Sequence, residues 1–282
     1  MRHLRSLLPT LLLPLASAFA APGDPAVLRT DPTIQAALAA AQKNEPEMIE
    51  VQVKLCEIPA PPFKEQKRAA AVKELFQQYG LQNVFIDPEG NVVGTRPGAK
   101  PHPHVVIAAH LDTVFPEGTD VTVKREVNLL KAPGIGDDTR GLAALLAVIR
   151  ALNEGKVQTP GTITFVADVG EEGLGDLRGI KRLFGETLKD QIDYFISIDG
   201  SDPERIVFAG VGSYRYRVSF KGPGGHSYGA FGLVNPVHAL GRAIAKIDAI
   251  QVPVNPKTTF NVGVIGGGTS VNSIPFEGWM EV

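Results

Sequence analysis

Acidic and histidine residues occur in four groups along the chain, and each group lies where an apolar run ends or a helix-like run begins. The groups are His110 with Asp112, Asp137 with Asp138, Glu171 with Glu172, and Asp199 alone. In open α/β sheets, ligands bind beside the carboxyl ends of the strands, so side chains that follow strands meet at one edge. A single carboxylate at a strand end is commonly a solvated cap. Four groups at one edge indicate a binding site.

The residue types favour a pair of divalent cations. Imidazole and carboxylate groups are ligands that zinc accepts. In the spacing His110-x-Asp112, the carboxylate can hold one ring nitrogen while the other nitrogen binds a metal. The adjacent Glu171 and Glu172 can divide the work, one taking a proton from water and the other binding metal. Such a site would activate a water molecule and polarise a carbonyl group.

The elements that carry these residues are predicted to alternate between strand and helix. Largely apolar runs at 105–109, 162–168 and 194–199 are typical of strands that are buried on both faces. Helix-like segments lie between them at 141–155 and 177–188. This order predicts an α/β domain with helices packed over a largely parallel sheet.

Two helices are predicted before the first of these strands. Residues 33–55 favour helix, and Pro46 predicts a break that divides this segment into two helical pieces. Residues 64–80 form an amphipathic pattern that ends at Gly80, a typical helix C-cap.

The pattern changes after Gly200 and predicts a second, smaller α+β domain. Strands are expected at 205–210, 214–222 and 258–268, with another beginning at 278. Asn235 and Pro236 predict the start of a helix, as N-cap and first-turn residue. We therefore divide the chain after its leader into a catalytic domain at 21–211 and a smaller domain at 212–282.

Residues 1–20 are interpreted as a cleavable signal peptide. Arg2 and Arg5 precede an apolar run, and Ala18-Phe19-Ala20 supplies the small residues that a signal peptidase reads, so cleavage is expected after Ala20. The run is too short and too interrupted by prolines to form a stable membrane anchor. We expect the protein to be secreted or periplasmic.

Composition excludes some classes of partner. The net charge of -2, from 28 basic and 30 acidic residues, gives no indication of nucleic-acid binding. Cys56 is the single cysteine, so no disulfide forms within the chain, and we expect a buried apolar role for it.

Several segments resemble the M20 metallopeptidases, the family of glutamate carboxypeptidases, tripeptide aminopeptidases and acetylornithine deacetylases. AAHLDTV, PGIGDDTRGLAAL, VADVGEEGLGDLRG and ISIDG follow one another in the family's order, and GPGGHSYG and NVGVIGGGTSVNSIP resemble its inserted lid domain. The resemblance covers nearly all of the chain after residue 20. It implies a zinc-exopeptidase-like catalytic domain with a ferredoxin-like lid, and a homodimer formed through that lid.

The resemblance also implies a role for each candidate residue. The metal ligands are His110 and Asp199 on one ion, Glu172 on the other, and Asp137 bridging both, with a cis peptide between Asp137 and Asp138. The remaining roles are Asp112 orienting His110, Glu171 as general base and acid, and His226 of the lid stabilising the oxyanion in a neighbouring active site. The position of Asp138 just before a predicted helix favours an N-terminal helix cap, or an acid that supports the ligands, over a metal ligand. Two Zn²⁺ ions are expected, with Co²⁺ or Mn²⁺ as alternatives.

The chain departs from the family pattern in two places. Thr139 stands where the family often has a lysine, and the sequence ends at Val282, in the middle of the lid by that pattern. We therefore expect a C-terminally truncated chain that lacks a final histidine ligand, with its last strand, from 278, left at an edge.

Three functions are compatible with these patterns. The first is hydrolysis of a peptide bond by an exopeptidase through a water activated by two zinc ions. The alternatives are an N-acyl amino acid amidohydrolase with the same machinery, and an inactive truncated binding remnant. The pattern disfavours a serine hydrolase, because the letters Gly225-x-Ser227-x-Gly229 run into loop rather than into a helix.

Overall fold

The structure, a computed structural model, describes residues 25–200, 202 and 204–282. The predicted signal peptide lies outside these residues. The chain divides into two compact units, one ending at Glu204 and the other spanning Arg205–Val282, and each is described by itself. This division falls seven residues before the boundary at 211 that the sequence predicted. No helix in the described part of the chain is long and apolar enough to cross a membrane.

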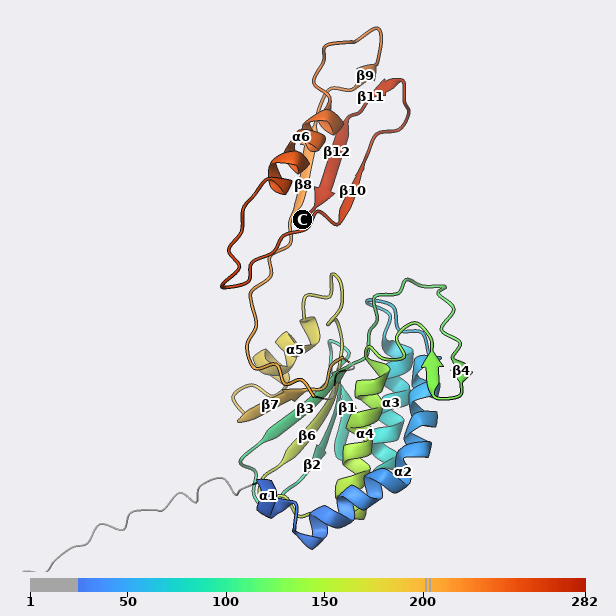
Figure 1. Cartoon of the computed structure of the whole chain (residues 1–282), viewed down its shortest axis with the longest axis vertical. Helices are drawn as coiled ribbons and strands as arrows, with labels where there is room; N and C mark the ends of the chain where they lie inside the picture. The colour runs from blue at the N-terminus through green and yellow to red at the C-terminus, as the bar shows by residue number, and fades with distance from the viewer. Residues whose placement is uncertain (1–24, 201, 203) are drawn as a thin grey trace, which may run out of the picture. The chain divides into compact units, whose positions relative to one another are not determined.

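The first unit is built on a five-stranded sheet in the order β1-β2-β6-β3-β7 (Figure 1). The strands are β1 Gln82–Ile86, β2 Val92–Arg96, β3 Val105–His110, β6 Ile163–Asp168 and β7 Tyr194–Ser197. β3 pairs in parallel with β6 on one side and with β7 on the other, whereas β2 pairs antiparallel with β6 and β1 pairs antiparallel with β2. The predicted α/β fold is confirmed, and its sheet is mixed because the β1–β2 hairpin extends one side.

Helices cover both faces of this sheet. The helices of the first unit are α1 Pro25–Leu28, α2 Pro32–Cys56, α3 Gln66–Gln78, α4 Thr139–Glu154 and α5 Arg178–Arg182, with a π-helical turn at Leu183–Thr187. The larger core packs α2, α3 and α4 against one face through side chains such as Phe76 and Leu145. The smaller core packs Leu183 against the other face. Burial on both faces explains the continuous apolar runs of the central strands. A short hairpin, β4 Lys124–Glu126 and β5 Leu129–Lys131, stands apart from the sheet.

The predicted helix break at Pro46 is wrong. Helix α2 runs through Pro46 without interruption, after an N-cap at Asp31 whose carboxylate accepts from the amides of the first turn. An interior proline costs about 3 kcal/mol. Contacts with α4 on both sides of the proline offset this cost: Asn44 donates to Glu154 (2.8 Å), and Glu47 pairs with Arg150 (2.7 Å).

The second unit is a three-stranded antiparallel sheet, β10-β12-β8, with one helix packed on β12 and β8. Its elements are β8 Arg217–Lys221, β9 Gly225–His226, α6 Pro236–Asp248, β10 Val264–Gly267, β11 Ser273–Ile274 and β12 Glu277–Glu281. Asn235 caps α6 and Pro236 opens it, as predicted.

Three expectations for the second unit are corrected. Residues 205–210 form no strand, because their apolar side chains lie exposed and no neighbouring strand pairs with them. The strand predicted at 258–268 is confined to Val264–Gly267, the part that pairs with β12. β12 is the central strand rather than an edge strand, since β10 and β8 pair with it on either side.

We predict that Gly155→Ala lowers the free energy of unfolding by about 1–3 kcal/mol, the usual cost of overpacking. Gly155 ends α4 against α2, and an added Cβ would lie 2.7 Å from both the Cβ and the backbone nitrogen of Ala37. Urea unfolding followed by circular dichroism measures the change. Gly185→Ala is the matched control, because an added Cβ there meets no atom within 4 Å. A Gly155→Ala protein as stable as the control would contradict the packing argument.

Candidate metal centre

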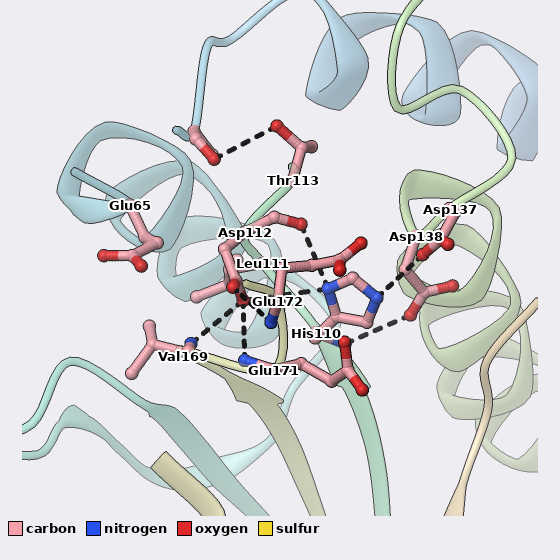
Figure 2. A network of polar contacts seen from close by, with 12 residues as sticks. Glu65, His110, Leu111, Asp112, Thr113, Asp137, Asp138, Val169, Glu171 and Glu172 are labelled. Carbon is pink, nitrogen blue, oxygen red and sulfur yellow. Dashed lines mark hydrogen bonds and ion pairs between the residues drawn. The ribbon is translucent and has the colours of Figure 1, made fainter. Parts of the chain in front are cut away.

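His110 ends β3 and lies buried at the centre of the polar network in Figure 2. Its Nδ1 is 3.0 Å from the backbone oxygen of Asp112, and its Nε2 is 2.9 Å from Oδ1 of Asp137. A carbonyl oxygen only accepts, so Nδ1 carries a proton and Nε2 faces the carboxylates. Burial alone would lower the pKa of His110, but the Asp112 carboxylate, 3.7 Å from Nδ1, and the charge of Asp138 help to raise it to about 10. In the metal-free protein the ring therefore holds a second proton on Nε2 at neutral pH.

The Asp112 carboxylate is fully buried and holds the loop that follows β6. Its Oδ1 accepts from the amides of Gly170 (2.9 Å) and Glu171 (3.3 Å), and its Oδ2 accepts from the amide of Glu172 (2.9 Å). Burial would raise the pKa of Asp112, but the neighbouring His110 imidazole and the hydrogen bond from the Glu172 amide hold it below its usual range. The carboxylate lies 3.7 Å from Nδ1 of His110, whereas the backbone oxygen of the same residue makes the shorter contact.

Asp137 and Asp138 divide two tasks across a cis peptide bond. Asp138 is buried, caps α4 by accepting from the amide of Gly141 (3.0 Å), and accepts from the amide of His110 (3.1 Å). Its cap role is confirmed, and burial raises its pKa to about 8. Asp137 is exposed, and its carboxylate turns toward the imidazole (Figure 2).

Two groups of potential ligands surround the imidazole. One consists of His110, Asp137 and Asp199, and the other of His110, Glu171 and Glu172; within each group the ligand atoms lie within 4.8 Å of one another. The first group is the set that the resemblance implied for one metal ion. In the second, Glu172 is grouped with Glu171 rather than with Asp137, although Asp137 is near enough to raise the pKa of Glu172.

The charges of these groups fit divalent cations. Burial raises the pKa of Glu171 and that of Glu172, and neighbouring carboxylates raise both further. Within the two ligand groups, positive charge comes from the proton that His110 holds between its ring and Asp137. A metal ion in that position would replace the proton and neutralise the crowded carboxylates. Imidazole and carboxylates are the donors that zinc and similar ions take.

Comparison with known proteins identifies the family. Residues 106–270 match the model of Peptidase family M20/M25/M40. The chain belongs to this family.

Solved structures and a curated relative agree with that membership. A tripeptidase from Staphylococcus aureus is 28% identical, with a TM-score of 0.63, over 84% of this chain and 65% of that one. The Bacillus subtilis YXEP protein, described as a dinuclear metal binding peptidase of family M20, shares the fold at 19% identity and a TM-score of 0.53, over 86% and 63%. A LysW-lysine/LysW-ornithine hydrolase of Pyrococcus abyssi is 32% identical over 127 residues, 45% of this chain and 34% of that protein. The chain thus spans less than two thirds of the length of each of these relatives.

Sequence reasoning missed Asp168 of this M20 chain. Asp168 ends β6, pairs in register with His110 of β3, and is 2% exposed. Its Oδ1 has no hydrogen-bond partner among the described residues, and burial raises its pKa to about 7. Its place at the end of an apolar run does not by itself distinguish it from a solvated strand cap. The apolar runs in the sequence start at 105 and 162 and do not show this register, which only the pairing of β3 with β6 in the structure gives.

Sequence reasoning also missed Arg68, a fully buried residue of α3. Its guanidinium donates to the backbone oxygens of Cys56 (3.3 Å), Ile58 (2.7 Å) and Leu111 (2.6 Å). Burial lowers its pKa to about 10. The bond to Leu111 helps to fix the turn between His110 and Asp112. Cys56 itself is buried, as predicted.

His226 lies in the second unit, at the end of β9, and is exposed. Its Nδ1 accepts from the amides of Tyr228 (3.2 Å) and Gly229 (3.3 Å). In a neutral ring the proton is then on Nε2, which can donate a hydrogen bond. The oxyanion role that the resemblance implies for His226 stays a prediction, as do the implied roles of the ligands.

We predict that Asp168→Asn stabilises the metal-free protein increasingly as the pH rises from 5 to 7.5. The folded pKa of about 7 exceeds the unfolded value of 3.8, so the unfolded chain loses its proton first and stability falls across this window. Asparagine stays neutral, so the variant escapes a loss that reaches a few kcal/mol, at about 1.4 kcal/mol per pKa unit. Urea unfolding at pH 5, 6 and 7.5 in the presence of a chelator measures the difference.

Asp190→Asn is the control for this comparison, because Asp190 is exposed. Its stability relative to the wild type should change equally at each pH. A constant difference between Asp168→Asn and the wild type across the three pH values would refute the assignment.

Proposed function

We propose that this chain carries the catalytic machinery of a metal-dependent exopeptidase that hydrolyses small peptides. The observation that carries the proposal is the pair of ligand groups around buried His110, one with Asp137 and Asp199 and one with Glu171 and Glu172. His110, Asp137 and Asp199 would hold one ion, and Glu172 the second. When bound, the two ions would lower the pKa of a water molecule and polarise the scissile carbonyl.

Glu171 moves the proton in this proposal. Its backbone amide is held by Asp112, and its carboxylate lies within the same ligand group as His110 and Glu172. The side chain is half-buried, so it reaches the site while remaining accessible to substrate. It takes a proton from the attacking water and delivers it to the leaving amine. Asp112 and Asp138 are fully buried, and they act by fixing the loop after β6 and the end of β3 rather than by reacting.

The substrate class rests on the relatives. The S. aureus neighbour is a tripeptidase, and a second solved neighbour, from Bacillus cereus, is the aminopeptidase PepT. A second candidate is hydrolysis of an N-acylated amino acid, and the similarity to the P. abyssi LysW-lysine/LysW-ornithine hydrolase supports it. Both reactions break a C–N bond through the same groups.

Three finer features belong to the same proposal. Zinc is the expected metal, with cobalt or manganese as alternatives, because the donors are nitrogen and oxygen. Export is supported by the charged and apolar pattern of residues 1–20. A homodimer through the second unit, with His226 acting at a neighbouring site, is supported by the resemblance of GPGGHSYG to the family's lid.

We expect about two zinc ions per purified chain, and hydrolysis of tri-alanine that a chelator abolishes and zinc restores. Elemental analysis and an amine-release assay on one sample measure both quantities. Parallel assays with N-acetylornithine distinguish the peptidase from the amidohydrolase. A protein that hydrolyses tri-alanine equally well after complete metal removal would exclude the proposal.

Glu171→Gln should lower kcat by about 10²–10⁴-fold, the usual contribution of a general base. Metal content should remain, because Glu172 and not Glu171 is the proposed ligand. Glu74→Gln, on an exposed position of α3, is the matched control and should keep full activity. Loss of metal together with activity in Glu171→Gln would reassign Glu171 as a ligand.

A further inference from the structure

The loop between β6 and α5, residues 169–177, holds Glu171 and Glu172 in an unusual backbone conformation. Gly170, Gly173, Asp176 and Leu177 all have positive φ angles, between 53° and 73°. The last two are not glycines, and L-residues avoid this region unless surrounding contacts impose it. The loop closes on itself through the Leu177 amide, which donates to the Gly170 oxygen (2.8 Å). Contacts from outside must therefore help to hold it.

Two contacts flank Gly170, and the first is the buried Asp112 carboxylate, which accepts from its amide. The other is the guanidinium of Arg178, which packs against Gly170. A Cβ added to Gly170 would lie 2.1 Å from Nη1 and 2.8 Å from Cγ of Arg178. Nη1 is buried and has no hydrogen-bond partner among the described residues. Gly170, the residue before Glu171, is thus confined between the Asp112 carboxylate and the Arg178 guanidinium.

Arg178 is itself fixed by contacts with two other segments, around residues 63–65 and at Glu89. Its Nη2 donates to Glu65 Oε1 (2.8 Å), and its Nε pairs with Glu89 Oε1 (3.0 Å). Its guanidinium carbon lies 4.7 Å from the centre of the Phe63 ring. Glu65 is nearly fully buried and also accepts from the Phe63 amide (2.9 Å). A cation with two carboxylates and an aromatic face has little freedom to move.

We propose that Arg178 is a positioning residue for the site. Glu65, Glu89 and Phe63 hold the Arg178 side chain in place, and that side chain packs against Gly170. The position of Gly170 in turn sets where the Glu171 and Glu172 carboxylates lie. Its effect on metal binding rests on the proposed function, whereas its effect on the loop does not. Replacing a residue that orients metal ligands typically costs 10–100-fold in metal affinity or activity.

The loop is tested first, in metal-free full-length protein, by hydrogen–deuterium exchange. Arg178→Met keeps most of the side-chain volume and removes the charge. We expect amide exchange in peptides covering 169–177 to be faster than in the wild type, because loss of the contacts that confine Gly170 makes local opening of the loop easier. Arg182→Met is the matched control on α5, since Arg182 pairs with Glu186 in the next turn, and it should leave the loop unchanged. Unchanged loop exchange in Arg178→Met overturns the proposal.

Metal binding is tested by titrating the same proteins with Co²⁺ in a calorimeter. Arg178→Met should weaken one binding event by about 10–100-fold, and leave the event that uses His110, Asp137 and Asp199 within about 2-fold. Arg178→Lys, which can still pair with Glu65, should recover part of the loss. Tri-alanine hydrolysis should show a lower kcat with KM nearly unchanged. Equal weakening of both events, or none, overturns the metal part of the proposal.

The two tests separate this inference from the proposed function. If the wild type binds no Co²⁺ while loop exchange responds to Arg178→Met, the metallohydrolase proposal fails and the positioning role is supported. If the wild type binds two ions and Arg178→Met matches it in exchange and affinity, the positioning role fails and the metallohydrolase proposal stands.

Discussion

Asp112 carries a carboxylate with no solvent exposure, and three consecutive backbone amides of the loop after β6 satisfy it. A buried carboxylate is costly unless hydrogen bonds compensate for the water that it loses, so this charge strongly favours a loop that presents those amides. The backbone oxygen of Asp112 accepts a hydrogen bond from Nδ1 of His110. One residue therefore couples the end of β3 to the loop after β6, and the other polar groups of the site are arranged around it.

The site separates buried acids, which support the backbone, from accessible acids near the imidazole. Asp138 and Asp168 are buried and have raised pKa values, and Asp138 caps the N-terminus of α4. Asp137, one peptide bond away, is exposed and reaches the imidazole. Glu171 and Glu172 are half-buried on a loop whose backbone is held by Asp112. Buried, hydrogen-bonded supports beneath accessible acidic groups are the combination that preorganised sites require.

Charge balance explains why this arrangement suits cations. Four carboxylates of the two ligand groups face a single imidazole, whose second proton lies between its Nε2 and Asp137. A proton carries one charge to one pair of atoms, whereas a divalent ion can serve several carboxylates at once. Asp168 adds a further buried acid beside His110, so the same crowding extends to the neighbouring strand. The raised pKa values of the buried acids and the predicted metal chemistry have the same physical origin.

The sequence alone determined the family, the α/β fold and the groups that form the site. Strand ends can be read from apolar runs, and residues that follow parallel strands meet at one edge, so His110, Glu171 and Glu172 could be brought together from the sequence pattern. The cap role of Asp138 and the start of α6 at Asn235 followed in the same way, because caps depend on local hydrogen bonds.

The predictions that failed concern features that distant contacts decide. Pro46 stays within α2 because α4 packs beside it, and residues 205–210 form no strand because no partner pairs with them. The roles of Asp168, Arg68 and Arg178 could not be read from spacing, since each depends on a strand register or on contacts with segments remote in the chain. Local sequence pattern fixes which residues lie at the edge of the sheet. Burial and long-range contacts decide which of these side chains are held by hydrogen bonds and which have shifted pKa values.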